Sequence, residues 1–298
     1  MAPLRLISLI SVAMLAFAGN SLLCRLALKH TAIDAATFTT IRLISGACIL
    51  WLVVQWQRRS SSVARADELS QHSLGGNWLS ALALFIYAAG FSFAYISMSA
   101  ATGALLLFGA VQVTMIGYGV YRGERLHTMQ LLGFALALAG LVVLMLPGLA
   151  TPSIAASLSM LGAGVAWGVY SLRGKATSRA VAANPTAVTA GNFIRAVPMA
   201  LVLSLLMMSR LSLDLNGILF AMASGALASG VGYAIWYQAL PALSSTHAAT
   251  VQLSVPVIAA LGGVVFIGEA LTLPMVLASG AILGGIALVI LKKRVLPQ

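Results

Sequence analysis

The sequence predicts an all-α membrane protein in which ten transmembrane helices form two inverted five-helix repeats. Three observations carry this prediction. The chain is apolar throughout, its apolar residues fall into ten runs long enough to cross a membrane, and its second half repeats a pattern of its first half.

The composition excludes a soluble protein. Of the 298 residues, 60% are hydrophobic and 8% are charged, whereas a soluble domain carries about a quarter of charged residues. The formal charge of +11 would suggest nucleic acid in a soluble protein. In a membrane protein, basic residues that hold loops on one side explain the charge, so we expect no nucleic-acid partner.

Cys24 and Cys48 lie in apolar runs and predict neither a disulfide framework nor a metal site.

A transmembrane helix needs about 20 mostly apolar residues, and the ten runs fall between recognisable breaks. Asp34, Pro147-Gly148 and Asn184-Pro185 mark three of these breaks. The first run contains Ala16-Phe17-Ala18, which is similar to a signal-peptide cleavage site, but we interpret the run as a retained helix because the second half has a counterpart. The runs span residues 4–27, 35–56, 77–98, 102–121, 128–147, 156–175, 185–208, 217–239, 246–267 and 273–292.

The stretch from Ser244 to Arg294 resembles a stretch 145 positions earlier. Both contain a Gly-Glu-x-Leu hinge between two apolar runs, and the whole chain has only three glutamates, so chance is a poor explanation. This internal duplication divides the chain into repeats at residues 1–150 and 151–298. The matched pairs are Gly117 with Gly262, Gly123 with Gly268, Glu124 with Glu269, Leu126 with Leu271, Leu132 with Leu277 and Gly140 with Gly285.

The distribution of Lys and Arg predicts that both termini face the cytoplasm. With the N-terminus inside, the cytoplasmic segments hold twelve of these residues and the outer loops hold three, which are Arg25, Lys29 and Arg210. Positive charge collects on the cytoplasmic side. Because each repeat has an odd number of helices, the second repeat enters the membrane from the opposite side. Inverted repeats are typical of secondary transporters, whose substrate site lies near the midplane between the repeats.

Several motifs resemble the drug/metabolite transporter superfamily, and specifically its ten-helix EamA-type members. They are Tyr237-Gln238-Ala239-Leu240, Ser254-x-Pro256 and the hinge at Gly268-Glu269-Ala270-Leu271, which Gly123-Glu124-Arg125-Leu126 repeats in the first half. The first half departs from the pattern at Val111-Gln112, which stands where Pro256-Val257 falls. The resemblance implies a transporter of the bacterial inner membrane. Within the superfamily the chain is most similar to a bacterial amino-acid exporter, which implies export of aromatic and other neutral amino acids.

Aromatic and amide side chains in the apolar runs are the predicted substrate-binding residues. A zwitterion needs a few polar points among apolar walls, and Trp167 and Tyr170 share one face of their helix because they are three residues apart. For each ring the alternative is packing or a place in the interfacial belt, and for Tyr237, near a helix end, we favour the belt. The predicted set is Trp167, Tyr170, Asn20, Gln252, Tyr87, Gln112 and Asn192.

Three further residues are predicted to form gates or hinges. Glu124 and Glu269 fall on opposite sides of the membrane and either close a gate or cap a helix turn, and of the two we favour capping. Pro256 lacks the N–H that would bond to the carbonyl of Gln252, which predicts a kink in the ninth helix.

Arg42 and Arg195 lie about two turns inside their helices. Burying a charge in hydrocarbon is costly, so we expect them to reach the headgroups or a helix end, with contact to a substrate carboxylate as the alternative.

These observations predict a transporter that works by alternating access and needs no cofactor or metal. We expect a small-molecule substrate, contact with membrane lipid and function as a monomer. All six carboxylates fall at helix ends or in loops, which favours movement down the substrate gradient over proton coupling. A drug or nucleotide-sugar exporter is the alternative, and an intramembrane enzyme is disfavoured because no acidic or histidine cluster is present.

The small-residue patterns Gly225-x-x-x-Ser229 and Gly280-x-x-x-Gly284 predict close helix packing.

Overall fold

The computed structural model describes residues 3–60, 75–123, 128–145, 153–180, 184–243, 251–252 and 254–291. Within these ranges every regular element is helical. The elements are α1 (Pro3–His30), α2 (Ala35–Ser60), α4 (Trp78–Tyr95), α5 (Ala100–Tyr121), α6 (Thr128–Met145), α7 (Ile154–Ala180), α8 (Pro185–Leu206), η1 (Met208–Arg210), α9 (Leu215–Ala223), η2 (Ser224–Val231), α10 (Gly232–Ala239), η3 (Leu240–Ala242), α12 (Ser254–Gly262), η4 (Gly263–Ile267) and α13 (Leu273–Leu291).

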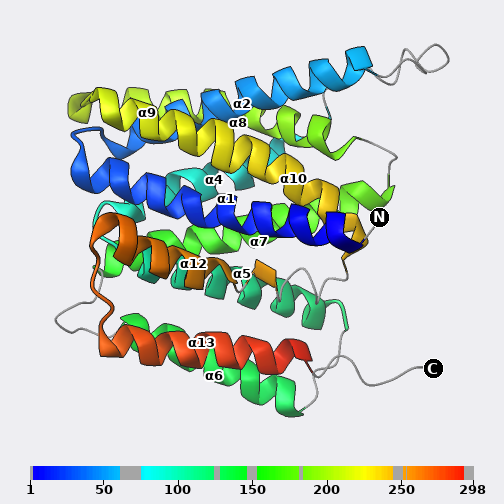
Figure 1. Ribbon diagram of the computed structural model, residues 1–298, viewed down its shortest axis with the longest axis vertical. Helices are drawn as coiled ribbons and strands as arrows, with labels where there is room; N and C mark the ends of the chain where they lie inside the picture. Colours follow the sequence, from blue (N-terminus) through cyan, green and yellow to red (C-terminus); the bar gives the residue numbers. More distant parts are fainter. Residues whose placement is uncertain are drawn as a thin grey trace.

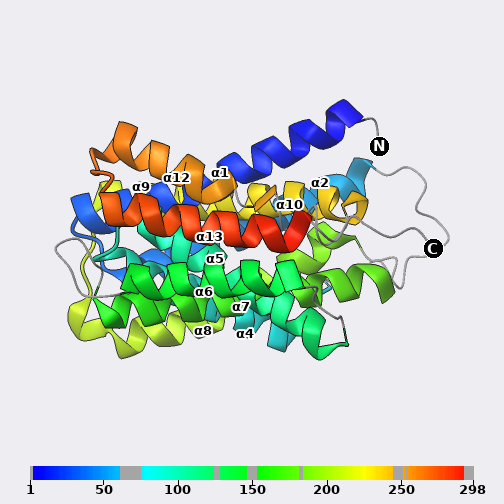
Figure 2. The ribbon, with the colours of Figure 1, turned by 90° about the horizontal axis from the view of Figure 1, so that it is seen from below.

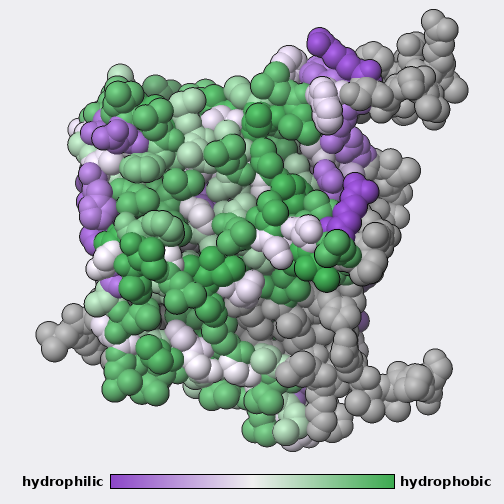
Figure 3. Space-filling view, viewed as in Figure 1, coloured by the Kyte–Doolittle hydropathy of each residue, from purple (hydrophilic) through white to green (hydrophobic). Residues whose placement is uncertain are grey.

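The predicted runs correspond to these helices, with α9, η2 and α10 forming one rod and α12 and η4 another. In the described ranges, seven helices have the length and apolarity to cross a membrane, and three shorter apolar helices lie at 128–140, 254–267 and 275–285. The space-filling view shows an apolar band between two polar edges (Figure 3). The chain is an all-α, multi-pass membrane protein, as the composition predicts.

Polar residues cap several helices and explain where they begin. Asn77 accepts a hydrogen bond from the Ser80 amide at the start of α4, and Asp214 does the same for Gly217 at the start of α9. Such caps satisfy N–H groups that have no partner inside the helix. Asn184 caps α8, whose first residue is a proline, a position where the missing N–H costs nothing.

The helices run as an antiparallel set, with the start of α1 and the end of α13 on one side of the molecule (Figure 1). This side is called the N-terminal side, and the side on which α1 ends at His30 is called the opposite side. Viewed at right angles, α1 and α12 lie along one face, and α4 and α8 lie along the other (Figure 2).

Helices of the two halves of the chain pack against one another. Helix α1 packs against α9, α10 and α12 of the second half, while α7 packs against α4 and α5 of the first half. The first helix of each half therefore contacts the third and fourth helices of the other, which is the reciprocal arrangement of an inverted repeat. Further contacts between the halves join α2 with α8 and α6 with α13.

The paired hinges share a backbone conformation. Gly123 and Gly268 both have positive φ, +91° and +67°, a region that glycine adopts without strain. A side chain at either position would meet open space, so the backbone angle, and not crowding, requires glycine there. The same turn thus ends a helix at equivalent points of the two repeats.

Small residues allow close helix contact at some of the predicted positions and not at others. A β-carbon on Gly225 would overlap the Arg42 carbonyl of α2, so the predicted packing is confirmed there. The prediction for Gly280 and Gly284 is wrong, because both face open space. The close contact between α6 and α13 is made instead by Gly285, where a β-carbon would overlap the Gly133 carbonyl.

Candidate functional site

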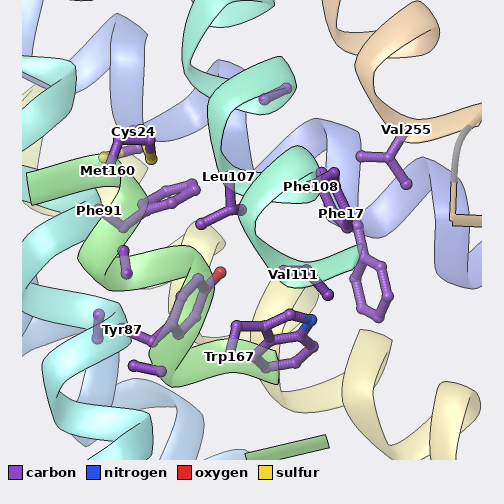
Figure 4. Packing of buried hydrophobic residues seen from close by; sticks show 14 of the residues in the cluster. Phe17, Cys24, Tyr87, Phe91, Leu107, Phe108, Val111, Met160, Trp167 and Val255 are labelled. Atoms are coloured by element: carbon purple, nitrogen blue, oxygen red, sulfur yellow. The ribbon is translucent and has the colours of Figure 1, made fainter. Parts of the chain in front are cut away.

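An aromatic cluster lies where the two halves meet, with Trp167 of α7 at its centre. The ring centroid of Trp167 lies 4.9 Å from Tyr87 of α4 and 4.8 Å from Tyr233 of α10. Phe17 of α1 closes the cluster with edge contacts at 6.0 Å to Trp167 and 5.7 Å to Tyr233. Each half contributes two of these rings. Figure 4 shows Phe17, Tyr87 and Trp167 turned toward one another.

These rings enclose a small central cavity. Its volume is about 10 Å³, which is the room that about one water molecule occupies. A metabolite of ten or more heavy atoms therefore does not fit into this cavity without rearrangement. The cavity is lined by Phe17, Asn20, Ser21, Tyr87, Phe91, Leu107, Phe108, Trp167 and Tyr233.

A hydrogen-bond network runs along one wall of the central cavity and joins four helices. The hydroxyl of Tyr87 accepts from Asn20 Nδ2 at 3.2 Å and from Arg42 Nη2 at 3.1 Å. Ser224 of η2 donates to Asn20 Oδ1 at 2.6 Å, and Arg42 Nε donates to Ser229 Oγ at 3.2 Å. Two of the predicted residues, Asn20 and Tyr87, are thus in direct contact although 67 positions separate them.

The expectation that Arg42 reaches the headgroups is wrong. Its side chain is 1% exposed, and its guanidinium carbon lies 5.1 Å from the Tyr87 ring centroid and 4.9 Å from that of Phe91. Its hydrogen-bond and ring contacts come from η2, through Ser229, and from α4, through Tyr87 and Phe91. Its counterpart Arg195 does meet a helix-end region, because its Nη1 donates to the carbonyls of Gly75 and Gly191 at 2.9 Å.

A second, smaller group of polar residues lies next to the central cavity. Asn192 Nδ2 donates to the Tyr170 hydroxyl at 3.4 Å, and the Asn77 amide donates to Asn192 Oδ1 at 3.0 Å. Tyr237 lies edge-on to Tyr170 at 6.2 Å and is only 4% exposed, so the expectation that it belongs to an interfacial belt is wrong. The Trp167 ring, 5.6 Å from Tyr170, connects this group to the central cavity.

The predicted binding residues therefore divide into three sets. Asn20, Tyr87 and Trp167 line the central cavity, while Tyr170 and Asn192 line a second cavity of about 10 Å³. Gln112 and Gln252 are buried but line neither.

An ion pair lies toward the opposite side of the molecule. Arg25 Nε of α1 lies 2.9 Å from Glu269 Oε1, with the side chains 10% and 8% exposed. Arg25 Nη1 also donates to the carbonyls of Tyr95 and Ile96 at the end of α4, at 2.9 and 3.0 Å. The other oxygen of Glu269 accepts from the Ala100 amide at the start of α5, at 2.7 Å. Three helix ends are thus joined to the connection before α13.

Glu269 caps α5 through the Ala100 amide and also pairs with Arg25, while its role in a gate stays a prediction. Its counterpart Glu124 lies outside the described residues. Pro256 is buried near the start of α12, and Val251 and Gln252 before it are also helical. Its role as a hinge stays a prediction.

Sequence reasoning missed several residues of the site, notably Phe17, Ser21, Arg25 and Phe91. Nothing in the local pattern distinguishes Phe17, Ser21 and Phe91 from packing residues in an apolar run. The charge count assigns Arg25 to an outer loop, but the structure places it within α1. Ser229 was attributed to helix packing alone, yet it also accepts from Arg42. Within the described ranges no three His, Cys, Asp or Glu side chains gather at a spacing that would hold a metal ion.

Comparisons with known proteins agree with this architecture. The chain is 52% identical over 286 residues to an uncharacterized protein of Pseudomonas aeruginosa, covering 96% of this chain and 94% of that protein. One solved crystal structure of a protein shares the fold with a TM-score of 0.65 at 20% identity, covering 97% of this chain and 98% of that one. The EamA-like transporter family matches residues 4–146 and again residues 154–291. The chain therefore belongs to the EamA-like transporter family.

Proposed function

We propose that this protein exports small zwitterionic metabolites, chiefly aromatic and other neutral amino acids, by alternating access. The observation that carries the proposal is the small central cavity, whose rings come in equal number from the two halves of the chain. Aromatic walls with a few polar groups suit a substrate that is apolar at one end and charged at the other. A site between two inverted repeats can face either side when the halves rock.

The two sides of the cavity have different roles in this proposal. The ion pair of Arg25 and Glu269 closes the opposite side, so this structure is sealed in that direction. Opening must separate α1 from the connection before α13, and the reciprocal packing of α1 and α7 supplies a matching movement in the other half. We place the N-terminal side in the cytoplasm of a bacterial cell, with the protein working as a monomer in the inner membrane.

We propose that the substrate gradient drives transport. In the described part of the chain no carboxylate lines the central cavity, so no acidic group there exchanges a proton against substrate. His247 lies outside the described residues. In proteoliposomes, an imposed pH difference is expected to leave a neutral amino acid at its equilibrium level, and sustained accumulation driven by that difference would contradict this part of the proposal.

Counterflow in proteoliposomes tests the substrate class. Vesicles are loaded with an excess of one unlabelled compound, and entry of the labelled form is followed for amino acids, sugars and cationic dyes. We expect L-phenylalanine, L-tyrosine and L-leucine to produce a transient overshoot that protein-free vesicles lack. Exchange of dyes or sugars alone would replace this proposal with the drug or nucleotide-sugar alternative.

A further inference from the structure

Arg42 places a positive charge inside the protein, and no carboxylate of the described residues pairs with it. The side chain is fully enclosed, its Nε and Nη2 bind only the neutral oxygens of Ser229 and Tyr87, and its Nη1 has no hydrogen-bond partner in the structure. An ion buried in a low-dielectric interior is costly unless an opposite charge and hydrogen bonds compensate it. The structure therefore contains an unbalanced charge beside the central cavity.

The carboxylates that the structure describes are all engaged elsewhere. Asp34 accepts from the amides of Ala36, Thr37 and Ser212, and Asp214 caps α9. Glu269 pairs with Arg25. Among the described residues, none of these groups is available to Arg42, so the described part of the chain supplies no counter-ion for it, and a bound anion can take that role.

The lining of the central cavity also lacks partners for its hydrogen-bond donors. Trp167 Nε1, Ser21 Oγ and Tyr233 OH are buried and make no hydrogen bond in the structure, and all three residues line the cavity. An indole N–H can only donate, and a hydroxyl can donate. A buried donor without an acceptor is costly, so the cavity is complementary to a ligand that is rich in acceptors.

Tyr87 connects this cavity to the charge. Its hydroxyl oxygen already accepts from Arg42 and from Asn20, which leaves its own proton to donate. A phenol that accepts from a guanidinium is polarised and becomes a stronger donor. Its hydroxyl is thus suited to an anion in the cavity, with the guanidinium immediately behind it.

We propose that the central cavity is a carboxylate site, in which Tyr87 donates to the carboxylate of the substrate and Arg42 supplies the balancing charge through Tyr87. Arg42 is a positioning residue here, because Tyr87 and Phe91 stand between its guanidinium and the cavity. This inference rests on the proposed transport function and narrows it, since it requires a carboxylate and excludes amines and sugars without one. The aromatic faces of Phe17 and Trp167 remain for the rest of the substrate.

Binding of matched probes to the purified protein tests the inference. The probes are L-phenylalanine, 3-phenylpropanoate, L-phenylalaninamide and phenethylamine, and the readout is the ratio of their dissociation constants from thermal stabilisation. We expect the two carboxylates to bind at least tenfold more tightly than the two compounds without one. Equal binding of acid and amide by the wild-type protein would overturn the carboxylate site, even where counterflow of amino acids proceeds.

Variants of Arg42 and Tyr87 distinguish an effect of the buried charge on binding from an effect on folding. Arg42→Gln is expected to remove the preference for acid over amide, Arg42→Lys to keep part of it, and Tyr87→Phe to lower it by roughly the tenfold that one good hydrogen bond supplies. Arg195→Gln is the matched control, since Arg195 is held by carbonyls away from the cavity, and it should keep the wild-type ratio. A ratio that Arg42→Gln leaves intact in folded protein would overturn the inference. Absence of any amino-acid counterflow would instead overturn the proposed function.

Discussion

The ion pair between Arg25 and Glu269 can be broken with almost no change in side-chain size by replacing Glu269 with glutamine. The amide oxygen can still accept from the Ala100 amide, as Oε2 does now at 2.7 Å. Its charge is gone, however, and Arg25 keeps only the carbonyls of Tyr95 and Ile96. We expect this substitution to weaken the closure of the opposite side.

The size of the effect follows from the burial of the pair. Removing one partner of a buried ion pair costs about 3–5 kcal/mol. Because Arg25 keeps two carbonyl acceptors and because part of the pair touches the surface, we expect the closed state to lose about 1–3 kcal/mol, which corresponds to roughly a 5- to 150-fold shift in a conformational equilibrium.

Cys24 is a native reporter of this shift. It is buried beside Arg25 on α1, so a water-soluble thiol reagent reaches it only when the closure opens. With exposed Cys48 replaced by serine, labelling of Cys24 in reconstituted vesicles should be slow in the otherwise wild-type protein. In the Glu269→Gln variant we expect it to be about ten- to a hundredfold faster, following the equilibrium shift.

Asp214→Asn is the matched control for this experiment. Asp214 is another carboxylate that caps a helix at the opposite side, but no arginine pairs with it in the described structure. Its loss should leave the labelling rate of Cys24 unchanged. The reasoning is refuted if Glu269→Gln labels no faster than the control, because the ion pair would then contribute nothing to closure.

The remaining predictions concern the site, the stability and the topology. Trp167→Ala and Tyr170→Ala should each lower counterflow more than they lower membrane abundance, and equal transport at equal expression would exclude both residues from the site. Burial raises the pKa of Asp34, but hydrogen bonds from Thr37, Ser212 and Ala36 outweigh it and hold the pKa below its usual range. Its contribution to stability is therefore present above about pH 4 and lost as the pH falls through the lowered pKa, so Asp34→Asn should lower the unfolding temperature at pH 7 and flatten its decline in acid. A cysteine at Ser62 should be shielded from an impermeant reagent in intact cells while one at Thr151 is labelled, and the reverse pattern would invert the topology.

Local signals were sufficient to place most helices. Apolar runs bounded by caps predict the start of α2 at residue 35, of α8 at 185 and of α13 at 273, as the structure has them. The aromatic and amide side chains could also be identified, because polar groups inside an apolar run are conspicuous. The hydrogen bond between Asn20 and Tyr87 could not be predicted from the sequence, because it depends on how α1 and α4 approach each other.

The closure and the buried charge depended on contacts that no local pattern encodes. Arg25 and Glu269 are 244 positions apart, and each reads locally as an ordinary residue at a helix end. The position of Arg42 along its own helix predicts that its side chain reaches the surface. In the fold α4 and η2 contact the side chain instead, and the small residues Gly225 and Ser229 allow the close approach of η2.

A reactive group placed inside the central cavity tests most directly whether this cavity is the route of the substrate. Ser21 lines the cavity and is buried, and Ser21→Cys is nearly isosteric. In this variant, with Cys24 and Cys48 replaced by serine, counterflow of L-phenylalanine is measured before and after treatment with a membrane-permeant thiol reagent. We predict that modification abolishes counterflow and that excess L-phenylalanine slows the modification. Full modification of Ser21→Cys with counterflow unchanged would contradict the account.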